Sequence, residues 1–571
     1  MKKIIICLLI TVCMVLGCAC GSSTPKPEGS GSAAAEPQNE TAQAAEKNGD
    51  VYIIYTSDVH CGVDQGFGFA GLQEIRNSLE EQGFTTILVD DGDFIQGELI
   101  GAMTKGESII EMMNALKYDV VIPGNHEFDY GVDQFMKLVE MAEFPVICCN
   151  FNKQGKLVCA PYIIKEAAGI KIAFVGVTTP KTITTSTPKF FQDEKGEYIY
   201  DFMQDETGGK LYQAVQDAVD AARADGADYV YLLAHLGDEM VCSPWTYADV
   251  ISNTNGIDVV LDGHSHDTEQ VVMKNKDGKQ VPRSACGTKM NAIGYSRISA
   301  EKGIEETNIW SWPNATSAVK LFHIENNVQD LVTEEFRKMD EQLGKVIAHS
   351  EVVLTMNDPE AKDESGNPIR MIRRAETNLG DFCADAVRSV RNCDIGIIGG
   401  GNIRDSLDKG DVSYRSLKSI FPWGNDIVVV EATGQQVLDA LEWGSRMVPE
   451  ESGAFLQVSG LSYEIDVTIP SSCVADVNGL FDHVAGQRRV KNVKVAGEPI
   501  DPNKTYTVAG NNYVLLNHGD GFTAFDGAKI VADRIKKDDE LLVDYVVDTL
   551  GGTVGEQYAD PYGQGRITIL Q

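Results

Sequence analysis

The chain from residue 51 onward alternates between two hydrophobic patterns. One is a short run of β-branched and other apolar residues, which is typical of a buried strand. The other, seen in Ala70–Gln82, Glu107–Lys117 and Val132–Glu143, places apolar residues three and four positions apart, as an amphipathic helix does. Runs of the first kind lie at Val51–Tyr55, Thr86–Val89, Asp119–Ile122, Pro145–Cys148, Lys171–Val177, Tyr229–Ala234 and Asp258–Leu261. The alternation predicts an α/β fold in which helices are layered on a central sheet.

Chain length and one charged helical segment suggest a division into domains. At 571 residues the chain exceeds the roughly 250 to 300 residues that one hydrophobic core supports. Residues 326–348 carry a helical pattern rich in charge, so we expect a helix there that links two domains. We therefore predict an N-terminal domain at residues 51–325 and a C-terminal domain at residues 349–571.

Residues 1–17 have the features of a targeting signal. A positively charged start precedes an apolar run that is too short to span a bilayer comfortably. The run ends in Val-Leu-Gly-Cys, which resembles a bacterial lipobox, so we expect cleavage before Cys18 and acylation of its thiol. Cys20 is an alternative acylation site, and an ordinary signal peptide without a lipid stays open.

The segment at residues 18–50 is rich in Ser, Pro, Ala, Glu and Gln and has almost no large apolar side chain. Such a segment cannot bury enough surface to order itself, so we expect a flexible tether. Tether and lipid together predict an exported protein on the outer face of a bacterial membrane, or in the periplasm or outer membrane of a cell with two membranes. The formal net charge of −35 argues against a nucleic-acid polymer as partner, because binding one relies on cationic side chains.

Polar side chains that can bind metals follow five of the predicted strands. Because the carboxyl ends of strands in an α/β sheet form one edge, residues distant in sequence should meet there. Five of the nine histidines occupy these positions, more than surface or packed histidines would explain. In chain order the positions are Asp58 and His60, Asp93, Asn125, His126 and Asp129, His235, and His264 and His266. Imidazole nitrogen mixed with carboxylate and amide oxygen suits a pair of divalent cations.

The motifs around these residues resemble the calcineurin-like metallophosphoesterases. They read Asp-x-His, Gly-Asp, Gly-Asn-His-Glu, His and Gly-His-x-His, in this order. The longer strings at residues 106–116 and 123–131 are similar to the 5′-nucleotidase branch, which includes bacterial UDP-sugar hydrolase/5′-nucleotidase and animal ecto-5′-nucleotidase. The resemblance extends from Val51 nearly to the C-terminus. It implies an N-terminal β-sandwich flanked by helices, a linker helix, and a C-terminal α/β domain that recognises the nucleotide.

The same resemblance implies roles for the polar residues of the first domain. One cation is implied at Asp58, His60 and His266, a second at Asn125, His235 and His264, and a bridge between them at Asp93. The metals stay open among Zn, Mn, Co, Fe and Mg, and some relatives carry Gln or Asn where this chain has His266. His126 and Asp129 resemble the catalytic dyad of the family, in which the carboxylate accepts a hydrogen bond from the imidazole. A helix cap before residues 130–143 is the alternative role for Asp129.

A second set of motifs, in residues 376–380, 399–406, 422–425 and 519–522, resembles the C-terminal domain of the family. By this resemblance, Trp423 and Phe522 stack against the base, a contact worth about 1–3 kcal/mol. Arg373 and Arg404 are directed at phosphate or a carboxylate. Arg374 is an alternative to Arg373, and the other expected contacts are Asn402, Asn425 and Asp526, the last at an unusual distance from Phe522.

The resemblance implies a metal-dependent phosphohydrolase with its site between two domains and a hinge near the linker helix. Nucleoside monophosphates are the expected substrates. UDP-sugars, other nucleoside diphosphates and 2′,3′-cyclic nucleotides remain alternatives, because loop shape decides among them. A nucleotide-binding lipoprotein without catalysis and a surface adhesin with an inert enzyme fold are hypotheses of a different class. The sequence does not indicate an oligomeric state.

Overall fold

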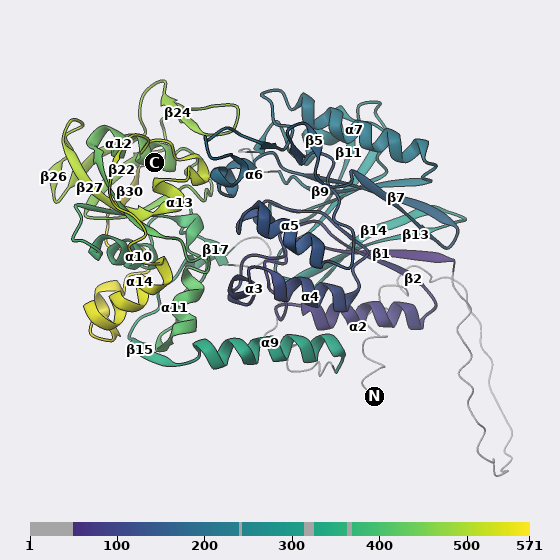
Figure 1. The fold of residues 1–571 in the computed structure, drawn as a ribbon, viewed down its shortest axis with the longest axis horizontal. Helices are drawn as coiled ribbons and strands as arrows, with labels where there is room; N and C mark the ends of the chain where they lie inside the picture. The colour runs from purple at the N-terminus through teal and green to yellow at the C-terminus, as the bar shows by residue number, and fades with distance from the viewer. Residues whose placement is uncertain (1–48, 239–241, 313–324, 363–367, 571) are drawn as a thin grey trace, which may run out of the picture.

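The computed structural model describes residues 49–238, 242–312, 325–362 and 368–570 (Figure 1). The predicted signal peptide, Cys18 and nearly all of the predicted tether lie outside the described residues. Two domains lie side by side, one drawn in purple to teal and the other in green to yellow (Figure 1). A search of the described helices finds none with the length and apolar character needed to cross a membrane.

Two β-sheets packed face to face form the centre of the N-terminal domain. In the described part of this domain, one sheet has the strand order β14 (Gly303–Ser311), β13 (Ala292–Ser299), β1 (Asp50–Thr56), β2 (Thr85–Asp90) and β3 (Val120–Val121). The other has the order β11 (Thr268–Lys274), β12 (Gln280–Cys286), β10 (Val259–Asp262), β9 (Tyr229–His235), β7 (Ile170–Thr178) and β6 (Tyr162–Ala167). Alternate strand residues such as Val51, Tyr55 and Phe174 share one buried core between the sheets. The predicted sandwich is confirmed.

Helices cover both outer faces of the sandwich. They are α2 (Gly68–Glu81), α4 (Glu107–Leu116), α5 (Val132–Met141), α7 (Gly209–Ala224) and α8 (Tyr247–Asn253). On the first sheet, Leu72 and Met113 of α2 and α4 pack against Ile54 of β1. On the second, Val215 of α7 joins the outward-facing residue Val175 of β7. The apolar faces that the sequence showed at helical spacing are thus the faces that cover the sheets.

The run Pro145–Cys148, which the sequence predicts as a strand, forms only isolated bridges. The amide of Ile147 donates to Val121 O of β3 (3.0 Å), whereas the next amide, that of Cys148, donates to Ala160 O (2.9 Å). The amide of Cys149 then donates to Gly176 O of β7 (2.7 Å). Because consecutive residues pair with different neighbours as the chain passes from one sheet to the other, no continuous ladder forms.

A single helix, α9 (Asn327–Leu343), lies in the predicted linker segment. Its side chains Val328 and Met339 are buried in the same core as α2 and α4 of the N-terminal domain. The C-terminal domain reaches it through Arg415 of α11 (Tyr414–Ile420), which donates to Asp340 Oδ1 over 2.7 Å. The helix is therefore in contact with both domains (Figure 1).

The C-terminal domain is also an α/β structure, as predicted. Over its described residues, one sheet has the order β21 (Leu456–Ser459), β18 (Ile395–Gly399), β27 (Thr505–Asn511), β20 (Ile427–Thr433) and β28 (Lys529–Ala532). A smaller sheet has the order β26 (Glu498–Pro499), β25 (Val490–Val495), β22 (Leu461–Asp466) and β30 (Ile567–Leu570). The main helices are α10 (Asn378–Ser389), α12 (Gly434–Gly444) and α14 (Asp538–Asp544). Shorter elements near the domain interface are α3 (Leu99–Thr104), α6 (Thr182–Thr185), α13 (Asn512–Leu515) and the 3₁₀ turns η1 (His126–Phe128) and η5 (Gly519–Gly521).

Candidate active site between the two domains

A cavity of about 390 Å³ lies where the two domains meet. The N-terminal domain contributes His126 and His264 to its wall, and the C-terminal domain contributes Arg404, Trp423 and Tyr513. The carboxyl ends of β1, β2 and β3 in one sheet and of β9 and β10 in the other lead into this region, because the strands run parallel within each set. The topology thus delivers the polar loops to one place, as the sequence predicts.

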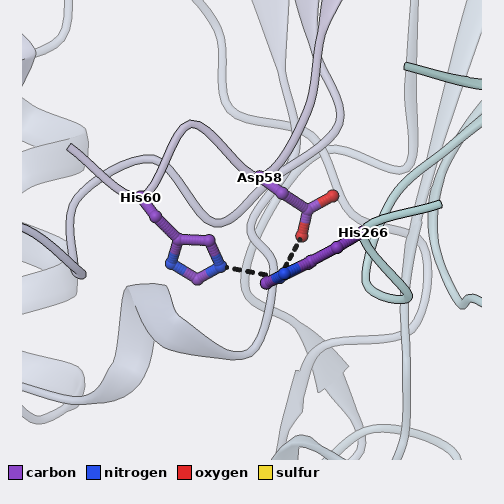
Figure 2. Close-up of side chains that lie close together, drawn as sticks. All are labelled: Asp58, His60 and His266. Atoms are coloured by element: carbon purple, nitrogen blue, oxygen red, sulfur yellow. Dashed lines mark hydrogen bonds and ion pairs between the residues drawn. The ribbon is translucent and has the colours of Figure 1, made fainter. Parts of the chain in front are cut away.

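The seven predicted metal donors form two adjoining groups, which together we call the metal cage. In the first group, Asp58, His60 and His266 point toward one another (Figure 2). The Nε2 atom of His266 lies 2.9 Å from His60 Nε2 and 3.4 Å from Asp58 Oδ1. Such close approach of three donor atoms from two loops distant in sequence is the arrangement that one cation requires.

The second group surrounds Asp93. Its Oδ2 lies 3.0 Å from His235 Nε2 and 3.8 Å from His60 Nε2, which belongs to the first group. The Oδ1 atom of Asn125 lies 2.9 Å from Nδ1 of His264. Asp93 therefore stands between the groups, in the place that a bridging carboxylate would occupy.

Backbone geometry sets most of the cage. Five of its seven residues have a positive φ, a conformation that costs a non-glycine residue on the order of 1–3 kcal/mol. These are Asp58 (48°), His60 (45°), Asp93 (62°), His264 (79°) and His266 (57°). Each lies two to four residues beyond the carboxyl end of β1, β2 or β10. Strain of this kind persists only where the surrounding fold holds it, which makes the cage preorganised.

The donor atoms fit a pair of divalent cations. Burial, together with the neighbouring Asp93 carboxylate, raises the pKa of Asp58 to about 8, even though His235 opposes the shift. The buried atoms Asp93 Oδ2 and His235 Nε2 lie 3.0 Å from each other, and neither makes a hydrogen bond of good geometry with a described residue. Incompletely satisfied buried polar groups are costly, and cations bound among these atoms would remove that cost.

Glu127 holds two loops of the cage together, a role that the sequence analysis missed. Its carboxylate is buried and accepts hydrogen bonds from the amides of Asp93 (2.8 Å), Phe94 (2.8 Å) and Gly124 (2.6 Å). It thereby ties the Gly-Asp loop to the Gly-Asn-His-Glu loop. The signal was present, because this glutamate is the last letter of the Gly-Asn-His-Glu motif.

A buried ion pair supports the loops that carry His235 and His264. Asp262 accepts hydrogen bonds from the amide of Leu236 (3.0 Å) and from the guanidinium of Arg283 (2.9 Å to Nη2). Arg283 is fully buried and also donates to Asp267. Because loops from two strands share these partners, they are held at a fixed separation.

The predicted dyad is in place. Nδ1 of His126 lies 2.6 Å from Oδ2 of Asp129, across the turn η1. Burial lowers the pKa of His126, but the carboxylates of Asp129 and Asp93 outweigh it and raise the pKa above its usual value. The N-cap of α5 is Gly131, so the structure gives Asp129 no role as the cap of this helix.

Five of the eight predicted substrate contacts line the cavity: Arg373, Asn402, Arg404, Trp423 and Asn425. The guanidinium of Arg404 lies over the indole ring of Trp423, 5.3 Å from its centre. Burial, together with the neighbouring Arg370 and Arg404, lowers the pKa of Arg373 to about 9. Three guanidinium groups crowded in a partly buried cavity favour an anionic ligand, because its charge relieves their repulsion.

The other three predicted contacts are not among the residues that line the cavity. Phe522 is 1% exposed and packs into the core of the C-terminal domain, which corrects its predicted place beside the base. Asp526 is exposed and lies 2.7 Å from His518 Nε2, and Arg374 stands outside the lining.

Tyr513 and Asp520 line the cavity instead. Asp520, at the centre of the turn η5, has a φ of 51°. Tyr513 lies before this turn, on α13, and lines the cavity, whereas Phe522 follows the turn and packs into the core. Tyr513 holds this turn through its hydroxyl, which accepts a hydrogen bond from the Asp520 amide (3.2 Å). Its only sequence signal is an aromatic residue upstream of Gly-Asp-Gly.

Comparison with known proteins places both domains. Residues 51–268 match the profile of the calcineurin-like phosphoesterases, and residues 346–527 match the 5′-nucleotidase C-terminal domain. The trifunctional nucleotide phosphoesterase YfkN of Bacillus subtilis is 25% identical over 91% of this chain, which spans 35% of the length of that relative. The silent protein UshA(0) of Salmonella typhimurium is 26% identical over 88% of this chain and 94% of its own length.

The fold agrees with these matches. The crystal structure of a 5′-nucleotidase precursor from Thermus thermophilus superposes with a TM-score of 0.72, at 25% identity, over 91% of this chain and 99% of that one. Calcineurin-like phosphoesterases are metal-dependent hydrolases that use two divalent cations, and the cage supplies a donor set of that kind. The chain therefore belongs to the 5′-nucleotidase family, in which a calcineurin-like phosphoesterase domain is joined to a 5′-nucleotidase C-terminal domain.

Proposed function

We propose that this protein hydrolyses the 5′-phosphate from nucleotides, with nucleoside monophosphates as its main substrates and two divalent cations as its cofactors. One observation carries the proposal. A single cavity has metal donors and the His126–Asp129 dyad on one side, and Trp423 and Tyr513 on the other. A nucleotide has the matching polarity, because its phosphate is anionic and its base offers flat faces for stacking.

The names of the relatives support this substrate class. One is called a nucleotide phosphoesterase and one solved structure is called a 5′-nucleotidase precursor. Close variants that cleave UDP-sugars, nucleoside diphosphates or 2′,3′-cyclic nucleotides would use the same cage, so the choice among them lies with the cavity wall.

In this proposal the two domains divide the work. When bound, the cations lower the pKa of a water nucleophile and neutralise phosphoryl oxygens. Arg373 and Arg404 orient the phosphate through their forked N–H groups. His126, whose pKa Asp129 raises, donates a hydrogen bond from Nε2 when protonated to the oxygen on which charge develops. Trp423 and Tyr513 hold the base, so that the scissile ester is presented to the cage.

Chelation and add-back of single metals tests the proposal. The protein is stripped with a chelator, reloaded with Mn, Co, Zn or Mg, and assayed for phosphate release from AMP and from an aryl phosphate that has no base. Release from AMP with at least one metal, and a lower KM for AMP than for the aryl ester, is the expected result. No release with any metal would favour a binding protein without catalysis.

We also propose that the protein is exported and held at a bacterial membrane by a lipid on Cys18. The support is the charged start, the apolar run and the Val-Leu-Gly-Cys string that ends it. Fractionation of cells that express wild type and Cys18→Ala tests this. The wild type should sediment with membranes and the variant should not; equal membrane association of both proteins would count against Cys18, and Cys20→Ala would then be examined.

A further inference from the structure

The indole of Trp423 makes a contact that base stacking alone does not require. Its Nε1–H donates a hydrogen bond to Oδ2 of Asp129 over 3.3 Å. The same oxygen lies 2.6 Å from Nδ1 of His126. The dyad belongs to the N-terminal domain and Trp423 to the C-terminal domain, 294 residues away. One side chain of the recognition domain thus reaches the carboxylate that orients the catalytic imidazole.

Contacts within its own domain hold each of Trp423 and Asp129 in place. Phe421, two residues before Trp423, is 1% exposed in the core of the C-terminal domain, and Gly424 turns the chain at a φ of 61°. The guanidinium of Arg404 covers the indole ring. Asp129 has a side chain that is 9% exposed, and its amide is bonded to His126 O (3.3 Å). Neither group can move far without the loss of these contacts.

The indole of Trp423 presents its ring to the cavity and its N–H edge to the dyad. Its ring lines the cavity, where stacking needs only a flat aromatic surface. Its N–H edge faces the dyad, where the donor fixes the orientation of an acceptor. A phenyl ring at this position would keep the first property and lose the second.

We propose that Trp423 is a positioning residue for the dyad: its indole N–H holds the Asp129 carboxylate toward His126, so that the domain arrangement seen here completes the catalytic site. This inference rests on the proposed function, because it assigns a second task to a residue that function already uses. A charge-assisted hydrogen bond that sets the geometry of a catalytic imidazole contributes to turnover rather than to affinity.

Substitution by phenylalanine separates the two tasks. In metal-loaded enzyme, Trp423→Phe should lower kcat by about tenfold for both AMP and the aryl phosphate, the effect of losing one hydrogen bond to a charged group. Its KM for AMP should stay close to that of wild type, because the phenyl ring still stacks. Trp423→Ala should lower kcat to the same extent and, in addition, raise the KM for AMP. Unchanged kcat in Trp423→Phe, or a loss confined to AMP, would overturn the inference.

A matched control and an activity-independent readout complete the test. Trp310→Phe removes an indole from strand β14, where the ring stacks on Tyr295 with 4.2 Å between the ring centres. This variant should leave both kcat and KM unchanged. In protein labelled with ¹⁵N at tryptophan, the indole resonance that disappears in Trp423→Phe is the one that belongs to Trp423. Asp129→Ala should shift this resonance and leave those of the other four tryptophans in place. No shift would show that the contact is not made in solution. If wild type releases phosphate from neither ester, the proposed function fails, while the NMR result still decides the contact.

Discussion

The two sides of the cavity are built on different principles. Five members of the metal cage are at most 2% exposed, and strained turns at strand ends aim most of its donors. The opposite side, which we call the recognition face, consists of Arg373, Asn402, Arg404, Trp423, Asn425 and Tyr513. Its side chains stand mostly half-buried on loops or at the ends of short elements. The chemistry is thus fixed by the sheets of the fold, whereas the choice of substrate is left to segments that can vary without disturbing those sheets.

Metal removal should produce the largest effect and should act on the cage alone. We expect kcat for AMP to fall by about a thousandfold or more, since bound cations contribute several kcal/mol to the stabilisation of the transition state. Nucleoside binding to the recognition face should survive, because that face contains none of the cage residues. Equilibrium dialysis of adenosine against stripped and reloaded protein checks this. Loss of adenosine binding together with the metal would show that the two sides are not independent.

His126→Ala tests the dyad, which lies between the two sides. Loss of a general acid or hydrogen-bond donor lowers turnover by about 10²–10⁴-fold, and we expect kcat to fall within that range. Metal content, measured by elemental analysis, should stay at the wild-type value because His126 is not one of the seven cage residues. The residue joins His60 and Asp93 in one group of possible donors, so a lower metal content would instead make it a ligand.

The difference between the metal cage and the recognition face also explains what the sequence could predict. The seven predicted metal donors and the His126–Asp129 pair lie together in the structure, because each follows an apolar run and the ends of those strands converge. Their roles as ligands and dyad are what the family resemblance implies. Phe522 was misplaced because the aromatic residue that lines the cavity here is Tyr513, which stands on α13 before the turn, while Phe522 packs into the core after it. Nothing in the letters Gly-Asp-Gly-Phe indicates that the phenylalanine faces the core. Glu127 was overlooked because its partners are backbone amides, which have no signature in a sequence.

Glu127→Gln probes how rigidly the cage is held. Its carboxylate oxygens each accept from two amides, Oε2 from Asp93 and Gly124 and Oε1 from Phe94 and Ile95. Glutamine puts an NH₂ group against one of these pairs, which leaves buried donors unsatisfied. We expect metal affinity to fall by about 10–100-fold, the usual effect of losing an outer partner of a ligand loop.

The matched control for this change is Glu107→Gln. Glu107 is half-buried and ion-paired with the exposed Lys137, so metal titration should not distinguish this variant from wild type. If Glu127→Gln binds metal as tightly as this control, the metal cage does not depend on the hydrogen bonds that Glu127 accepts.

Tyr513 and Phe522 give the sharpest test of the recognition face, because the sequence favours one and the structure the other. Tyr513→Ala should raise the KM for AMP by about tenfold, in line with the 1–3 kcal/mol of a lost base stack, and leave the aryl phosphate unaffected. Phe522→Leu should leave both KM values unchanged and lower the melting temperature, since the ring packs among the core residues of the C-terminal domain. The reverse pattern, a raised KM in Phe522→Leu and none in Tyr513→Ala, would mean that the base binds where the sequence placed it. A polar substitution at Asp520, Asp520→Asn, then locates the ribose: it should change the KM for AMP only if the turn η5, which is hydrogen-bonded to the Tyr513 hydroxyl, also contacts the sugar.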